Sequence, residues 1–323
     1  MAKIAGSAEV CTFWPPTGEA AGAVEKAGVT QKRMATIRWT NTRVFLSMEP
    51  HQHTSAAARL SPKGYWPRTD RGLLRLTGRD ALSFLQALVS NDVEALPVGG
   101  VCDAVYLTPQ GRMITDMRVF RRADDVIVSV PAELAAALAD RLDSLIFSED
   151  VQIADVSSSM SQLTLVDEGL STHDVVDELP PPGVPELPAA DLELRRIEGG
   201  VAKWGVDMTE ETIPLEAGLL DRAISQSKGC YVGQEVIIRV LHRGGGRVAK
   251  RLMKLTLEPG SSAPEPGAPI EINGAVVGHV TSAAYSPTEK RAFALGYVKR
   301  EHAEAGTDVS VGLVPAVLRG AAS

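Results

Sequence analysis

The sequence predicts an α+β body followed by a small all-β domain. Two observations carry this prediction: strands and helices alternate between residues 71 and 168, and five short strands follow at regular spacing after residue 250. A glycine triplet at 244–246 separates the two patterns. The 323 residues are enough for two or three domains. A hydrophobic content of 44% and a charged content of 23% are typical of a soluble globular protein.

Residues 1–66 are predicted to form a poorly ordered N-terminal extension. The segment lacks the charged-then-apolar order of a signal peptide. Its basic, acid-free part at 32–48 faintly resembles a transit peptide, but such a segment would normally begin a chain. No apolar run anywhere reaches the ~18 residues that a membrane span needs, so no membrane partner is expected.

The body is predicted over residues 67–246. A strand ending at Gly78 is followed by RDALSFLQALVSNDV (79–93), which places leucines at helical spacing. A hairpin is indicated by DAVYLTPQGRMITDMRVFRR (103–122), whose Pro-Gln-Gly turn separates two strand-like runs. A second helix is expected at 131–147, because a proline suits the first helical turn. Further strands are expected at 124–130, 151–157 and 161–168.

A proline-rich surface loop is predicted at 177–191, which holds five prolines. After it, residues 191–207 (DLELRRIEGGVAKWGVD) read as a strand and a glycine turn, and residues 214–230 read as a helix. The C-terminal domain, 247–323, is predicted as a sandwich or barrel, with Asn273-Gly274 as a tight hairpin turn. Its strands are expected at 250–258, 268–274, 275–286, 291–299 and 307–314.

Charge, cysteine usage and missing motifs exclude several classes of function. A net charge of −7 and a pI of about 5.5 argue against direct, nonspecific nucleic-acid binding. The three cysteines, Cys11, Cys102 and Cys230, give neither a disulfide framework nor a pair at metal-ligand spacing, which indicates a reducing, cytoplasmic setting and no metal site. Neither G-x-G-x-x-G after a strand nor G-x-x-x-x-G-K-[ST] occurs, so nucleotide-binding readings fail.

The stretch KGCYVGQE (228–235) holds the most unusual cysteine. A thiol between Lys228 and glycines could lie on an exposed turn, where the ammonium would lower the pKa of Cys230. A thiolate would serve as a nucleophile, a soft metal ligand or a redox group. The alternative is a small buried apolar side chain, which spacing alone favours.

The other residues of this octapeptide have simpler readings. Gly229 and Gly233 allow tight backbone conformations that expose the side chains between them. Gln234 and Glu235 either fix the loop by hydrogen bonds to backbone N–H groups or form a solvated helix start. Tyr231 could stack on a flat ring or pack in the core, and packing is the simpler expectation.

KGCYVGQE resembles the hallmark of the YgfZ-type folate-binding proteins, relatives of the aminomethyltransferase (T-protein) of the glycine cleavage system. Supporting stretches occur in the same order along residues 70–315: TGRDALSFLQALVSNDV, LTPQGRMITDMRVF, GGVAKWGVDMTEETIPLEAGL, GHVTSAAYSP and ALGYVKR. The resemblance implies a T-protein-like body of two α+β subdomains and a C-terminal β-barrel, arranged around a central channel that binds tetrahydrofolate. It also implies a role in maturing iron–sulfur enzymes, including tRNA-thiolating ones, which would make iron–sulfur assembly or client proteins the partners.

The same resemblance selects candidate folate-binding residues. Glu216 matches the segment that reads the pterin, whose ring N–H and amino group one carboxylate accepts in parallel. Arg239 is the candidate for the carboxylates of the folate tail, since a guanidinium binds a carboxylate through two hydrogen bonds. A group of cations beyond it is interpreted as a solvated basic hinge: His242, Arg243, Arg247, Lys250 and Arg251.

Asp116 decides between an assembly factor and a transferase. Aminomethyltransferases carry paired acids after the glycine of the hairpin, and the matching positions here are Thr115 and Asp116. A lone carboxylate could position folate or take part in proton transfer, or be structural. The missing acid favours a non-enzymatic, folate-dependent assembly factor over an aminomethyltransferase, and a tRNA-modification protein that binds RNA directly is the third hypothesis.

Overall fold

The computed structural model describes residues 62–242 and 245–323. The predicted extension falls outside this part up to residue 61. Its last residues do not fit the prediction, because strand β1 (Gly64–Pro67) pairs with a strand of the body and Trp66 is buried. Within the described part, no helix is both long and apolar enough to cross a membrane.

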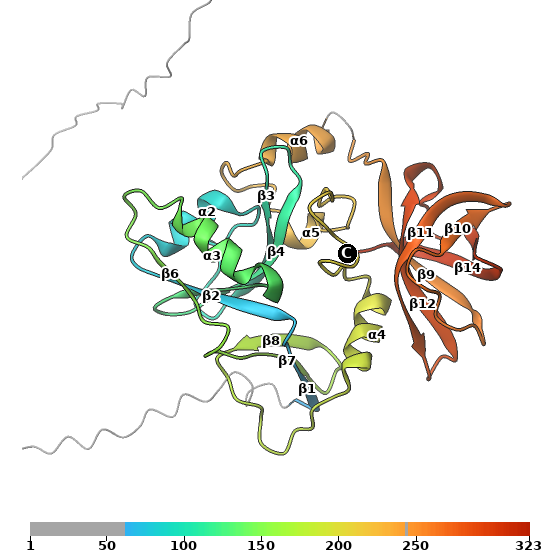
Figure 1. Ribbon diagram of the computed structural model, residues 1–323, viewed down its shortest axis with the longest axis horizontal. Coiled ribbons are helices and arrows are strands. Elements are labelled where there is room, and N and C mark those ends of the chain that lie inside the picture. Colours follow the sequence, from blue (N-terminus) through green and yellow to red (C-terminus); the bar gives the residue numbers. More distant parts are fainter. Residues whose placement is uncertain (1–61, 243–244) are drawn as a thin grey trace, which may run out of the picture. The chain divides into compact units, whose positions relative to one another are not determined.

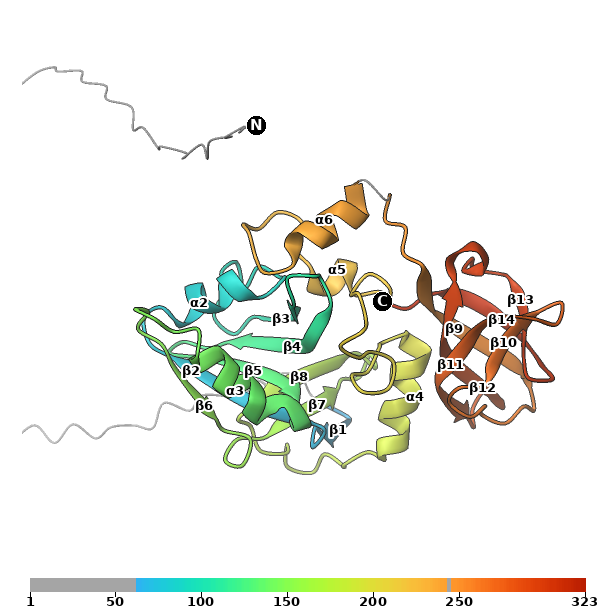
Figure 2. The same cartoon turned by 45° about the horizontal axis from the view of Figure 1, so that its top comes forward.

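The first half of the body is built on a five-stranded sheet with the order β3-β4-β5-β2-β6. Helices α2 (Ala81–Leu88) and α3 (Ala135–Asp143) cover one of its faces and share a hydrophobic core with it (Figure 2). The short helix η1 (Ala132–Leu134) precedes α3. The strands are β2 (Arg71–Thr77), β3 (Val101–Leu107), β4 (Met113–Arg121), β5 (Val126–Pro131) and β6 (Gln152–Asp155). The predicted hairpin and both helices of this region are confirmed.

A second, three-stranded sheet with the order β1-β7-β8 lies against the other face. It adds β7 (Gln162–Val166) and β8 (Thr172–Val176). The contact between the two sheets is partly apolar, with Val176 packed against Phe120 and Ile127. It is also partly polar, since the Ser129 hydroxyl donates to Gln162 Oε1 at 2.6 Å.

Two predictions for the rest of the body are wrong. Residues 191–207 begin with helix α4 (Ala189–Gly199) and not with a strand, although Leu192 and Leu194 alternate with charged residues. The helix is supported by a Glu193–Arg196 ion pair and is followed by Gly200, whose φ of +81° suits the residue after a helix. The long helix expected at 214–230 is reduced to α5 (Leu220–Ala223), and α6 (Gln234–His242) begins inside the octapeptide.

The C-terminal domain is a closed six-stranded barrel with the order β10-β11-β12-β9-β14-β13 (Figure 1). This confirms the barrel, and the Asn273-Gly274 turn has the positive φ angles of a tight hairpin. The stretch predicted as one strand at 307–314 contains a second turn at Gly312-Leu313. The strands are β9 (Lys250–Pro259), β10 (Pro269–Ile272), β11 (Ala275–Ser286), β12 (Arg291–Lys299), β13 (Asp308–Val311) and β14 (Val314–Ala321), and η2 (Arg300–His302) follows β12.

A single buried carboxylate, Asp207, connects the barrel with the body. Its Oδ2 accepts from Arg196 at 2.6 Å and from the Lys203 backbone N–H at 2.9 Å. Its Oδ1 accepts from the hydroxyls of Thr281 and Ser282, where β11 has an irregular register. Every oxygen of this buried charge is therefore hydrogen-bonded, which offsets the cost of removing it from water.

Candidate functional site

The octapeptide packs on the turn between β3 and β4. Gly233 has a φ of +82°, and a Cβ atom added there would lie 2.5 Å from the backbone oxygen of Thr108. Across the same contact, a Cβ on Gly111 would lie 2.8 Å from Val236 Cβ. Figure 1 shows α6 beside this hairpin. The loop can approach the turn this closely only because both facing residues lack side chains.

We expect Gly233→Ala to destabilise the protein by about 2 kcal/mol or more, since it combines a positive φ with a backbone clash. Gly229→Ala is the matched control inside the same motif, because nothing lies within 4 Å of its added Cβ and its φ is not positive. Denaturant unfolding of both variants checks the difference. Equal stability of the two would contradict the close packing of this loop.

Lys228 is buried and serves the structure of the body. Its Nζ donates to three backbone carbonyls just beyond and within the last turn of α2: Gln86 at 2.6 Å, Val89 at 2.6 Å and Asn91 at 3.0 Å. Burial lowers the pKa of Lys228 to about 8. The three donors of this ammonium are used on backbone carbonyls of another segment, so no hydrogen bond joins it to Cys230.

The two described cysteines have different environments. Cys230 is exposed, as the functional reading of the octapeptide requires. Cys102 lies half-buried on β3, where burial and the neighbouring Asp103 raise its pKa to about 12 and so keep it protonated. In the described part of the chain, Cys230 is therefore the accessible thiol and Cys102 the unreactive one.

The remaining octapeptide residues are structural or solvent-exposed. Tyr231 is buried in the core, and its ring centroid lies 5.4 Å from the Lys228 ammonium; burial raises the pKa of Tyr231 to about 12. Gln234 begins α6 and donates its backbone N–H to the Tyr231 carbonyl at 3.3 Å. Glu235 and Arg239 form an exposed ion pair one helical turn apart. Tyr231 therefore packs rather than offering a free ring face, and Arg239 is partly neutralised by its own helix.

Glu216 is a buried carboxyl group on the loop before α5. Burial raises its pKa, while Lys250, the Ile213 backbone N–H and Arg112 act in the opposite direction. Leu252 of β9 donates its backbone N–H to the Glu216 carbonyl at 2.8 Å, so the barrel holds this loop. The Glu216 carboxyl group is therefore a buried hydrogen-bond acceptor that forms no ion pair with a described side chain.

An aromatic ring and a cation complete the surroundings of Glu216. The Tyr297 hydroxyl donates to the Asp207 carbonyl at 3.0 Å, and the Lys250 ammonium lies 4.4 Å from the Tyr297 ring centroid. Burial raises the pKa of Tyr297, and the charge of Glu216 acts in the same direction. Sequence reasoning missed Tyr297, which lies in an ordinary barrel strand, and it placed Lys250 in a solvated hinge.

Asp116 lies on β4, on the face toward the second sheet. Its Oδ2 accepts from Arg71 at 2.9 Å, and Arg71 also donates to the Ser129 hydroxyl and carbonyl. Its other oxygen, Oδ1, is buried and has no hydrogen-bond partner in the described part of the chain. Thr115, the position of the missing acid, is completely buried opposite Tyr106 and faces the core that α2 and α3 cover. Nothing in the sequence around Arg71 indicated its pairing with Asp116.

The structure brings these candidates to the borders of one hydrophobic cluster. Val105, the register partner of Asp116, shares this cluster with Ala217 and Tyr231. No hydrogen bond or ion pair joins Asp116, Glu216 and Cys230 to one another within residues 62–242 and 245–323. In the same residues, no group of three or more His, Cys, Asp or Glu side chains could hold a metal ion.

The fold is that of a T-protein. The chain is similar to the crystal structure of glycine cleavage system aminomethyltransferase T from Bartonella henselae, with a TM-score of 0.69 and 19% sequence identity over 80% of this chain and 85% of that one. At that identity the likeness concerns the fold alone. It includes the mixed α/β body and the closed C-terminal barrel.

Two family models of the glycine cleavage T-protein match separate parts of the chain. Residues 33–180 match the GCVT N-terminal domain, and residues 250–318 match the glycine cleavage T-protein C-terminal barrel domain. It is 29% identical to a "Putative transferase At1g60990, chloroplastic" of Arabidopsis thaliana over 75% of this chain and 66% of that protein. It is 27% identical to an "Aminomethyltransferase" of Synechocystis over 77% of this chain and 80% of that protein.

Proposed function

We propose that this protein binds tetrahydrofolate and that Glu216 reads the pterin ring. The observation that carries the proposal is the burial of this carboxyl group without an ion-paired side chain, beside Tyr297 and Lys250. A buried acceptor is costly unless a donor meets it, and a pterin offers two adjacent N–H donors. Bound folate would supply an acceptor for one-carbon units. The residues present therefore fit the ligand.

Asp116 and Arg239 have secondary places in this proposal. The buried, unpartnered Oδ1 of Asp116 is suited to accept a hydrogen bond from folate or to take part in proton transfer. Arg239 would have to exchange its Glu235 partner for a tail carboxylate. Such an exchange costs little, because an exposed ion pair contributes at most about 1 kcal/mol.

We further propose that the protein is an accessory factor of the YgfZ type for iron–sulfur cluster assembly or repair, working in a reducing compartment such as the cytoplasm. In this reading Cys230 is the reactive or ligating group, and the client enzymes include tRNA-thiolating ones. Two observations support it: the octapeptide displays an exposed thiol, and the position of the second acid is a threonine sealed in the core.

The alternative is an aminomethyltransferase that transfers a one-carbon unit to tetrahydrofolate. Several similar proteins are named aminomethyltransferases, which favours it. The chemistry of the chain is less favourable, because the one remaining acid, Asp116, is ion-paired with Arg71. Direct RNA binding by a tRNA-modification protein is a third reading, which predicts binding that weakens steeply with salt.

Complementation separates these functions. In cells that lack the native protein, we expect Cys230→Ala to lose support of an iron–sulfur enzyme such as a tRNA methylthiolase, while Cys102→Ala retains it. Full rescue by Cys230→Ala would contradict the cysteine-centred role. Aminomethyl transfer from a lipoyl-protein intermediate to tetrahydrofolate, measured with the purified protein, would instead establish the transferase.

A further inference from the structure

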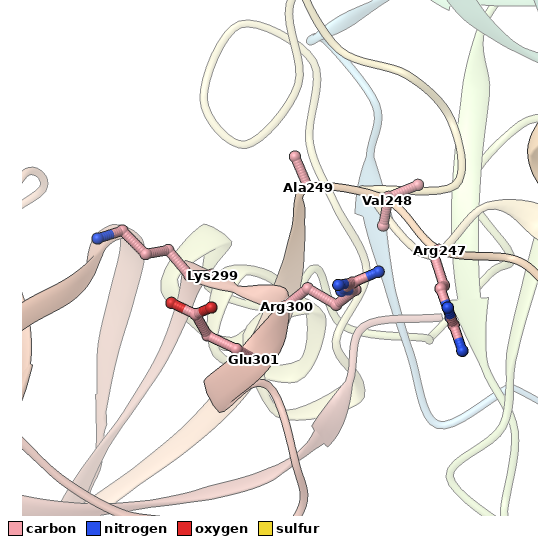
Figure 3. Close-up of a pocket in the computed structure, with 6 residues that line it drawn as sticks. All are labelled: Arg247, Val248, Ala249, Lys299, Arg300 and Glu301. Atoms are coloured by element: carbon pink, nitrogen blue, oxygen red, sulfur yellow. The ribbon is translucent and has the colours of Figure 1, made fainter. Parts of the chain in front are cut away.

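A cavity of about 420 Å³ lies where the linker from the body enters the barrel. One wall is formed by Arg247, Val248 and Ala249, and the other by Lys299, Arg300 and Glu301 (Figure 3). Arg300 extends from the end of β12 toward the segment that carries Arg247. Two arginines and one carboxylate therefore border this space, while the Lys299 side chain extends away from the arginines (Figure 3).

The pairing of β9 with β12 brings these cations together from positions about fifty residues apart. Lys250 lies directly opposite Lys299 in the ladder, and the Arg300 backbone N–H donates to the Ala249 carbonyl at 3.1 Å. Like charges directly opposite each other destabilise a sheet. The register is fixed by the apolar residues of the barrel, and the Lys250 ammonium lies 4.4 Å from the Tyr297 ring centroid, beside Glu216.

The two arginines at the cavity have no ion-paired partner in the described part of the chain. In the described part of the chain, the side chains of Arg247, Lys299 and Arg300 make no hydrogen bond or ion pair, and Glu301 lies 3.6 Å from His302 instead. The linker is held in place by Val248, which is 6% exposed. The chain has a net charge of −7, so unpaired positive charge gathered around this cavity contrasts with the rest of the protein. A functional site would explain it.

We propose that this cavity is a binding site for a small polyvalent anion, held mainly by Arg247 and Arg300. The site lies outside the Glu216 surroundings and is distinct from the pterin-reading role proposed above. Two arginine forks suit a ligand with several anionic groups close together, either a short oligophosphate or an oligocarboxylate. A single monovalent anion would leave the charge of one of the two arginines unneutralised.

Calorimetric titration of the full chain at low ionic strength tests the proposal, with inorganic tripolyphosphate in one arm and a triglutamate peptide in the other. We expect saturable binding of at least one anion. The Arg247→Gln/Arg300→Gln double variant should weaken it at least tenfold, since each charge-assisted hydrogen bond contributes appreciably. Loss of tripolyphosphate binding alone identifies a phosphate site, and loss of triglutamate binding alone identifies a carboxylate site; loss of both shows that charge alone is recognised.

The control is Arg79→Gln, which removes an exposed cation away from the cavity and should leave the affinity unchanged. Because the substituted side chains are exposed, thermal unfolding should show that the variants fold as the original protein does. The proposal is overturned if neither anion binds, if the double variant binds as tightly as the original chain, or if Arg79→Gln weakens binding equally.

Discussion

Glu216→Gln is expected to lower the affinity for tetrahydrofolate at least about 100-fold without destabilising the protein. The carboxylate would accept two N–H groups of the pterin, and each such charge-assisted hydrogen bond contributes about 1.5–3 kcal/mol. The glutamine amide replaces one acceptor by a donor, which would face a pterin donor. Since Glu216 is buried, removing its charge also removes a desolvation cost.

The difference in stability between this variant and the original chain should depend on pH, because folding raises the pKa of Glu216 in the original chain. A carboxyl whose pKa is raised by folding favours the folded state fully below its ordinary pKa of 4.5, and this contribution is lost as the pH rises through the folded-state pKa. The Gln variant should therefore gain stability relative to the original chain as the pH rises toward neutrality. Folate binding by the original chain should weaken as the pH falls through the same pKa, because a protonated carboxyl cannot accept both hydrogen bonds.

Fluorescence or calorimetric titration with tetrahydrofolate, combined with thermal unfolding, checks both effects. Glu210→Gln is the matched control, since it changes an exposed glutamate six residues earlier on the same segment. Unchanged folate affinity in Glu216→Gln would remove the pterin-reading role. A fall in stability together with the loss of binding would show that Glu216 supports the fold.

Lys228→Met is expected to destabilise the protein by about 3 kcal/mol. Methionine keeps most of the side-chain volume but leaves the carbonyls of Gln86, Val89 and Asn91 without their donor. Each buried carbonyl left unsatisfied costs about 1–3 kcal/mol, and relaxation with water recovers part of that cost. The end of α2 and the octapeptide would then lose their connection.

Thermal unfolding measures this as a fall in Tm of about 6–12 °C for a unit of this size. Lys290→Met is the control, because Lys290 is exposed on a barrel turn and its change should lie within about 0.5 kcal/mol. The competing interpretation assigns Lys228 to the activation of Cys230. That interpretation would be supported if Lys228→Met slowed alkylation of Cys230 while leaving Tm unchanged.

The octapeptide shows which structural features its local sequence predicts and which it does not. Its two glycines predicted a tight loop that exposes the residues between them; the structure exposes Cys230 but buries Tyr231. The hydrogen-bond partners of Lys228 could not be predicted, because its three acceptors lie about 140 positions earlier in the chain. Adjacency to Cys230 suggested an electrostatic role, but a flexible four-carbon side chain can reach a helix end that only folding brings near.

The sequence by itself determined the α+β body, the hairpin at 103–122 and most of the barrel strands, because local periodicity and turn residues encode these features. It could not distinguish strand from helix at 191–199. The alternation of two leucines with charged residues predicted a strand, although Glu193 and Arg196 have the i,i+3 spacing of an ion pair on a helix. The tertiary structure alone placed Tyr297 and Lys250 beside Glu216, paired Arg71 with Asp116, and set Lys250 opposite Lys299. These contacts join residues 34 to 81 positions apart, and the separations are closed by strand pairing and domain packing, which no local pattern records.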